Sequence, residues 1–105
     1  MRIVGITACT AGIAHTYIAK EKLIRAAQEL GHEVKIETQG SLGLEDELTM
    51  DDVEKADVVI IAADIGVMKK ERFEGKKVVE MPVSVVVKSP KAVIQKIEEK
   101  LNEIK

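Results

Sequence analysis

Short apolar runs rich in β-branched residues alternate along this chain with segments of helical periodicity, and this alternation restricts the fold more than any other feature. Strands are predicted at 3–7, 32–38, 57–63 and 77–81, and helices at 13–30, 49–55, 67–73 and from Pro90 onward. Such an order predicts an α/β protein, a three-layer α/β/α sandwich with a four-stranded parallel sheet, doubly wound and Rossmann-like. The run 57–63 is apolar throughout, as expected of a strand covered on both faces.

Local signals set the expected ends of the helices. Gly31 is the predicted C′ residue of the first long helix. Residues 49–52 resemble a capping signal, with Asp in place of the usual Glu, and Ser89 with Pro90 predicts an N-cap followed by a proline at N1. The stretch 83–87 has the composition of a strand, but we expect an irregular connection there.

Composition excludes several classes of function. A length of 105 residues fits one domain, 1–105, and the 2% aromatic content argues against a surface that stacks nucleic-acid bases. The net charge of -2 provides no strong field for nucleic acid or an anionic membrane. The chain begins without a signal-peptide pattern, and its longest apolar run, 58–63, is too short for a bilayer. We therefore expect a cytoplasmic protein without membrane insertion.

The candidate chemistry lies in the loop after the first predicted strand. Cys9, the only cysteine, precedes the first long helix, whose N-terminal N–H groups and positive dipole end favour a thiolate and can hold phosphate oxygens. Gly12 lets the backbone approach a ligand, and His15 and Thr16 add donors. A single cysteine is more often a small buried hydrophobe, but the strand–loop–helix position favours a nucleophile.

Cysteine-dependent phosphatases have a comparable loop, Cys-x5-Arg-Ser/Thr. Here His15 occupies the arginine position, and imidazole cannot hold phosphate in the bidentate geometry of a guanidinium. The Asp-Pro pair that commonly supplies the general acid is also missing from the sequence. Hydrolysis should therefore be slow, and a phosphocysteine that persists suits a relay.

The stretch 9–16, Cys-Thr-Ala-Gly-Ile-Ala-His-Thr, resembles the phosphorylation loop of the fructose-type enzyme IIB domains of the sugar phosphotransferase system, usually Cys-Pro-Thr-Gly-Ile-Ala-His-Thr. Further matching stretches are 30–40, 56–64 and 71–73, so the resemblance extends from residue 3 to about 82. It implies a sugar phosphotransferase in which Cys9 accepts phosphate from a phosphohistidine of enzyme IIA. Cys9 then donates it to a sugar bound by the membrane enzyme IIC, with fructose as the default. Other hexoses, hexitols or mannosyl compounds remain open.

The predicted site follows from these matches. Cys9 is the expected catalytic nucleophile, and no metal or organic cofactor is required. The residues expected to bind phosphate are Thr10, Ala11, Gly12, Ile13, Ala14, His15 and Thr16. Thr10 and Ala11 replace the family's Pro-Thr, which puts phosphate affinity and partner choice in question. The chain length implies a stand-alone IIB subunit or one excised from a larger polypeptide.

Other polar residues follow the second and third predicted strands. Thr38, Gln39 and Gly40 could support a loop or dock a partner, or form an ordinary turn. Asp64 could hydrogen-bond the active loop or cap the next short helix. The cluster Lys69, Lys70 and Arg72 is interpreted as a solvated helix face, His32 as a surface strand residue, and Glu37 as lying on the exposed side of its strand.

Two other functions stay open at this point. One is a cysteine-dependent enzyme of the low-molecular-weight phosphatase or arsenate reductase kind. Against it stand the missing arginine, the missing Asp-Pro pair and the lack of a second cysteine. The other is a non-catalytic regulator that uses an IIB-like fold to bind another protein.

Overall fold

A computed structural model describes residues 1–8, 13–40 and 43–104, with side chains described except at 13–15 and 102–104. The strands are β1 (Arg2–Ala8), β2 (Glu33–Gly40), β3 (Gly43–Glu45), β4 (Val58–Ala63) and β5 (Val78–Met81). The helices are α1 (Ile13–Glu29), α2 (Met50–Lys55), the 3-10 helix η1 (Lys70–Phe73), α3 (Val83–Lys88) and α4 (Pro90–Ile104).

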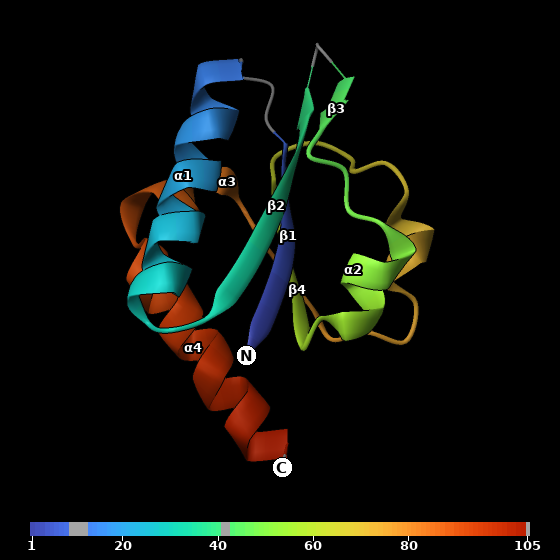
Figure 1. The fold of residues 1–105 in the computed structure, drawn as a ribbon. Coiled ribbons are helices and arrows are strands. Elements are labelled where there is room, and N and C mark those ends of the chain that lie inside the picture. Colours follow the sequence, from blue (N-terminus) through green and yellow to red (C-terminus); the bar gives the residue numbers. More distant parts are fainter. Residues whose placement is uncertain (9–12, 41–42, 105) are drawn as a thin grey trace.

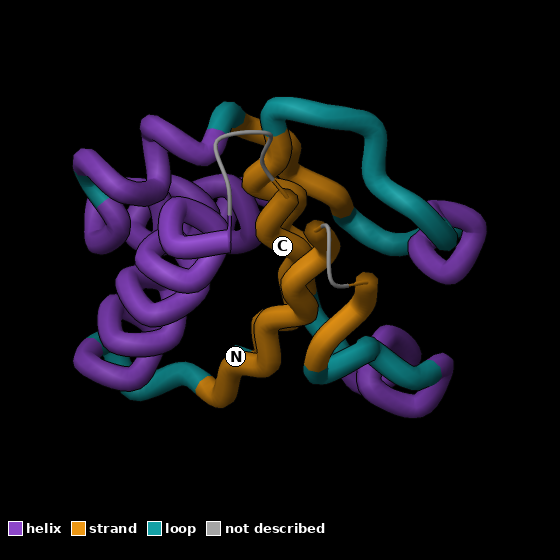
Figure 2. The backbone as a smooth tube through the Cα atoms, turned by 90° about the horizontal axis from the view of Figure 1, so that it is seen from above, coloured by secondary structure: helices purple, strands orange, loops and turns teal. Residues whose placement is uncertain are grey.

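The sheet has the order β3-β2-β1-β4-β5. Four strands are parallel, and β3 adds a short antiparallel pairing to β2 at one edge. Helices α1, α3 and α4 cover one face, and α2 and η1 cover the other (Figures 1 and 2). The predicted α/β sandwich is therefore confirmed, and β3 is an additional strand that the sequence did not predict.

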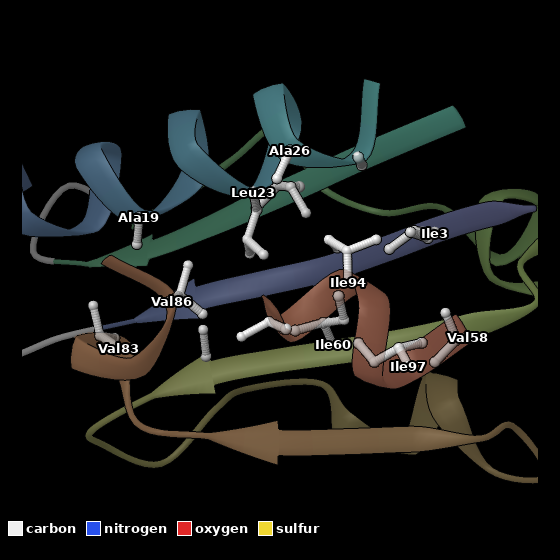
Figure 3. Close-up of a cluster of buried hydrophobic side chains, with 14 residues drawn as sticks. Ile3, Ala19, Leu23, Ala26, Val58, Ile60, Val83, Val86, Ile94 and Ile97 are labelled. Atoms are coloured by element: carbon white, nitrogen blue, oxygen red, sulfur yellow. The ribbon is translucent and has the colours of Figure 1, made fainter. Parts of the chain in front are cut away.

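Two apolar clusters hold the layers together. The larger lies between the sheet and α1, α3 and α4, where Leu23, Ile60 and Ile94 are fully buried (Figure 3). The smaller includes Val53 and Phe73 and lies under α2 and η1. Burial of one such aliphatic side chain contributes about 1.5–3 kcal/mol, so each face of the sheet has its own source of stability.

Most of the expected helix ends are confirmed. Gly31 has φ 82, as a C′ residue requires, and the Thr49 hydroxyl and the Asp52 carboxylate form a capping box at α2. The expectation for 83–87 was wrong, because Val83–Lys88 is a helix. It follows Pro82, and Val83 and Val86 are buried against α1 and α4, so packing overrides β propensity.

The interpretation of His32 as a surface residue was also wrong. Its ring lies between the N-terminal amine and α4, with Nδ1 3.1 Å from the N-terminal amine of Met1 and Nε2 3.4 Å from Oε2 of Glu98. The side chain is only 10% exposed. His32 directly follows the turn at Gly31, and α4 covers it from the other side.

Candidate functional site

The carboxyl ends of three neighbouring strands meet at one edge of the sheet. Ala8 ends β1 and is paired with Gln39 of β2 on one side and Ala63 of β4 on the other. The N–H of Asp64 donates to the carbonyl oxygen of Ala8 at 3.0 Å. The sheet thus brings Ala8, Gln39 and Asp64 together, as expected for a parallel α/β fold, in which ligands bind beyond the strand ends.

Four of the predicted site residues, Cys9, Thr10, Ala11 and Gly12, lie outside the described residues. The backbone of Ile13, Ala14 and His15 forms the first turn of α1, and their side chains are not described. The assignment of Cys9 as nucleophile and of 10–16 to phosphate binding therefore stays a prediction. What the structure establishes is the geometry of the residues around them.

Helix α1 begins at this same edge (Figure 1). The first N–H groups of a helix have no partner within it, and together with the helix dipole they favour an anion at the N-terminal end. Thr7 fixes the helix to β1, since its buried hydroxyl donates to the carbonyl oxygen of Thr16 at 3.3 Å. Thr16 is itself only 4% exposed.

A buried carboxylate, that of Glu37, lies in β2 close to this end of the sheet, on the face covered by α2 and η1. Glu37 is fully buried and accepts from the Leu48 N–H at 2.8 Å, from Gln39 Nε2 at 2.7 Å, and from Arg72 Nη1 at 2.8 Å and Nη2 at 3.1 Å. Burial acts to raise the pKa of Glu37, but the hydrogen bonds from Arg72, Gln39 and Leu48 outweigh it and hold that pKa below its usual value. Glu37 is therefore a carboxylate at neutral pH.

Two interpretations from the sequence are corrected by this network. Glu37 does not face solvent, and the Arg72 side chain is only 8% exposed rather than part of a solvated helix face. The predicted fold already indicated such a pair. In a sheet covered on both faces, a charged residue in a strand is buried, and a buried charge requires a partner. The pairing itself links residues 35 positions apart, and nothing local indicates it.

Gln39 connects β2 to the segment that follows β4. Its Nε2 donates to the Met68 carbonyl oxygen at 3.1 Å, and its Oε1 accepts from the Met68 N–H at 2.8 Å. The side chain is 3% exposed. Gln39 is therefore hydrogen-bonded to the segment after β4, and the roles considered for 38–40, support of a loop, docking of a partner or an ordinary turn, stay predictions. Thr38 is also buried, at 4% exposed, and Gly40 ends the strand.

Asp64 caps a helix, but a different one from the helix considered in the sequence. Its Oδ1 accepts from the N–H of Val83 at 3.2 Å, at the start of α3 rather than of η1. With its own N–H bonded to Ala8, Asp64 joins the end of β1 to the beginning of α3.

The β2–β3 hairpin is tied to α1 on the other side of the edge. The Tyr17 hydroxyl donates to the Glu45 carboxylate, and Lys20 forms an ion pair with Asp46. The hydrogen bond to Glu45 raises the pKa of Tyr17, so its hydroxyl stays protonated at neutral pH. Three supports therefore surround the end of β1: α1, the hairpin and the segment 64–69.

Comparison with known proteins identifies the family. The family model described as "PTS system, Lactose/Cellobiose specific IIB subunit" matches residues 4–96. The chain belongs to the enzyme IIB family of the phosphotransferase system (PTS). It is 53% identical over 97 residues to the PTS system fructose-like EIIB component 2 of Escherichia coli (strain K12), covering 92% of each chain.

Two further relatives extend this result. The solution structure of an enzyme IIB subunit of the PTS from Escherichia coli K12 superposes with a TM-score of 0.91 at 36% identity, covering 97% of this chain and 94% of that one. The PTS system fructose-specific EIIABC component of Bacillus subtilis (strain 168) is 44% identical over 95 residues. This match covers 90% of this chain and 15% of that longer protein.

Membership makes this protein a sugar phosphotransferase enzyme IIB, as the resemblance predicted. Enzyme IIB domains work with IIA and IIC components, and names such as EIIABC record chains in which the three are fused. Among the helices of the described residues, none is both long enough and apolar enough to cross a membrane.

Proposed function

We propose that this enzyme IIB carries a phosphoryl group on Cys9, accepting it from a phosphohistidine of enzyme IIA and donating it to a sugar bound by enzyme IIC. The observation that supports this most is the position of Ala8. Ala8 ends the central strand between Gln39 and Ala63, at the edge where α1 begins, and Cys9 is the next residue in the sequence. Edges of this kind bind ligands in open α/β sheets.

The transfer consists of two displacements at phosphorus. The Cys9 thiol loses its proton to solvent, and the thiolate attacks the phosphorus of the phosphohistidine. An S–P bond forms, the P–N bond breaks, and the electron pair returns to the imidazole nitrogen. A sugar hydroxyl oxygen then forms the O–P bond while the S–P bond breaks. The hydroxyl proton passes to solvent, and Cys9 is left as the thiolate.

The segment 10–16 holds the phosphoryl oxygens in this proposal. Backbone N–H groups from Thr10 to His15, together with the positive end of α1, stabilise both the thiolate and the phosphocysteine. Gly12 permits close approach, and Thr16, buried beside Thr7, orders the first turns of the helix. No metal or organic cofactor enters either step.

Fructose is the sugar we propose first, because the curated relatives have names that refer to fructose. The matching family model has a name that refers to lactose and cellobiose. A sugar panel should therefore include these disaccharides as well as hexoses and hexitols. We place the protein in the cytoplasm, where it would exchange phosphate between a soluble IIA and the inner side of IIC.

The test is the mass of the intact protein after incubation with phosphoenolpyruvate, the general phosphotransferase proteins and a fructose-type enzyme IIA. We expect one added phosphoryl group on the wild type and on Gln95→Ala, a control on the exposed side of α4. We expect none on Cys9→Ser and none when IIA is left out. Adding membranes that contain the matching IIC and fructose should then remove the phosphoryl group from the protein.

Two results would contradict the proposal. A phosphoryl group that remains on Cys9→Ser would place the acceptor elsewhere in the chain. Rapid release of inorganic phosphate from the wild type without a sugar would instead favour a phosphatase, the rival that the cysteine loop left open.

A further inference from the structure

The segment 64–69 is held in a conformation that it would not adopt freely. Lys69 has φ 61 and ψ 34, the left-handed region that residues with a Cβ rarely occupy. Hydrogen bonds fix the backbone on both sides of this residue. The peptide of Met68 is bonded to Gln39, and the carbonyl oxygen of Lys69 accepts from Arg72 Nε at 2.9 Å. Backbone strain of this kind concentrates at functional sites.

All the described hydrogen bonds of the Gln39 amide go to Met68 and Glu37. Its oxygen accepts from the Met68 N–H, and its nitrogen donates to the Met68 carbonyl oxygen and to the Glu37 carboxylate. These partners fix the orientation of the amide, because the opposite orientation would place the NH₂ group against an N–H. Glu37 in turn is held by two hydrogen bonds from Arg72, so the amide of Gln39 has a fixed partner on its buried side.

The path of the segment follows from the order of the strands. β2 and β4 lie on opposite sides of β1. A segment that leaves β4 and is bonded to Gln39 of β2 therefore passes β1 on the face covered by α2 and η1, toward which the side chains of Glu37 and Gln39 point (Figure 2). It begins at Asp64, whose N–H is bonded to Ala8, the residue before Cys9. The bonds of Gln39 thus hold this segment beside the end of the strand that leads to Cys9.

The same segment presents apolar side chains to solvent. Met68 is 53% exposed and Ile65 is 39% exposed, although the described core leaves few large apolar side chains uncovered. Ile65 and Val67 also line an open groove of about 330 Å³ that continues to Met81 and Pro82 at the end of β5. A protein that delivers a phosphoryl group to the residue after Ala8 has to approach this end of the sheet, where the segment begins at Asp64.

We propose that Gln39 is a positioning residue for the acceptance of phosphate: it fixes the Met68 peptide so that 64–69 keeps the shape on which the phosphohistidine-bearing donor domain docks. The inference rests on the proposed function, and it adds a residue and a surface that the nucleophile alone does not require. Because Gln39 acts on docking rather than on the reacting atoms, its loss should change the donor concentration needed for half-maximal rate.

The experiment measures the rate of phosphoryl transfer from purified phospho-IIA as its concentration is varied. Gln39→Met keeps the length of the side chain and removes the amide, and Gln39→Asn keeps the amide but places it one carbon short of Met68. For both we expect the half-saturating concentration to rise about tenfold, while the maximal rate changes by less than about threefold. Two chemically different variants keep the test valid if one of them folds poorly.

Val93→Ala is the matched control. Val93 is 7% exposed in the larger cluster, on the face covered by α1, α3 and α4, so its truncation lowers stability on the side of the sheet away from Gln39 and Met68. Its half-saturating concentration should equal that of the wild type. An unchanged value in both Gln39 variants, or an equal rise in Val93→Ala, would overturn the positioning role. Lack of transfer to the wild type would instead refute the proposed function, and this inference with it.

Discussion

The guanidinium of Arg72 and the carboxylate of Glu37 form a buried ion pair, with Nη1 and Oε1 2.8 Å apart and the side chains 8% and 0% exposed. The pair lies between η1 and β2, where Arg72 also donates to the carbonyl oxygens of Leu48 and Lys69. A charge removed from water is tolerated only when its hydrogen bonds are satisfied. Here the carboxylate has four donors, and the guanidinium joins Glu37 of β2 to the backbone carbonyl oxygens of Leu48 and Lys69.

Removal of the arginine should therefore be costly. In Arg72→Met the apolar length of the side chain is kept, but Glu37 is left as a buried charge without its main partner. We expect the free energy of unfolding to fall by about 3–5 kcal/mol. Urea denaturation at pH 7 measures it. The control is Lys70→Met, which breaks the exposed ion pair with Glu80 (52% and 59% exposed) and should cost no more than about 1 kcal/mol. Equal losses in the two variants would contradict this account.

The same pair predicts a change with pH. The pKa of Glu37 is lowered in the folded protein, so its stabilising contribution is present above its unfolded pKa and is lost as the pH falls through the folded value. In Arg72→Met, burial without the guanidinium should raise that pKa, and protonation at acid pH then relieves the unpaired charge. The gap in unfolding free energy between wild type and variant should therefore narrow from pH 7 to about pH 4. A gap that stays constant would show that Glu37 is not the group responsible.

Much of the fold could be predicted because its signals are local. The continuous apolar run that became β4, the glycine at position 31 and the capping box at Thr49 each report on neighbouring residues. The stretch Val83–Lys88 could not be predicted in this way. Its valines favour a strand, but Asp64 caps its first turn and α1 and α4 bury its apolar side. Such contacts appear only once the chain is folded.

The candidate site could likewise be predicted only in part. The order of strands and helices predicts that the carboxyl ends of neighbouring strands meet, and the sheet does bring Ala8, Gln39 and Asp64 together, while the role of Cys9 stays a prediction. The support beneath that edge was missed, because the alternation in β2 made Glu37 look solvent-facing. A period of two assigns side chains to faces, but it does not tell which face is covered.

The capping box at α2 predicts a second effect of pH, independent of the buried pair. The hydrogen bond from Lys35, with those from Thr49, lowers the pKa of Asp52 to about 2. The stabilisation of the folded state by the Asp52 carboxylate is thus present above the unfolded pKa of about 3.9 and is lost as the pH falls towards 2. Asp52→Asn keeps the shape and an acceptor for the Thr49 N–H, so it removes only the charge. Urea midpoints should differ at pH 7 and converge near pH 2, whereas Asp51→Asn, at an exposed carboxylate, should change little.

Gly5 predicts a steric requirement at the centre of the sheet. A Cβ there would lie 2.9 Å from the carbonyl oxygen of Ile60 and 3.0 Å from Cδ1 of Ile36, so β4 or the core would have to move. We expect Gly5→Ala to lower the free energy of unfolding by about 1–3 kcal/mol. Gly40→Ala is the control, since a Cβ at Gly40 meets nothing within 4 Å and its φ lies outside the left-handed region. That variant should be neutral or more stable by about 0.4–1 kcal/mol, because alanine restricts the unfolded chain. A Gly5→Ala protein as stable as Gly40→Ala would mean that β1 and β4 are less closely packed than this geometry requires.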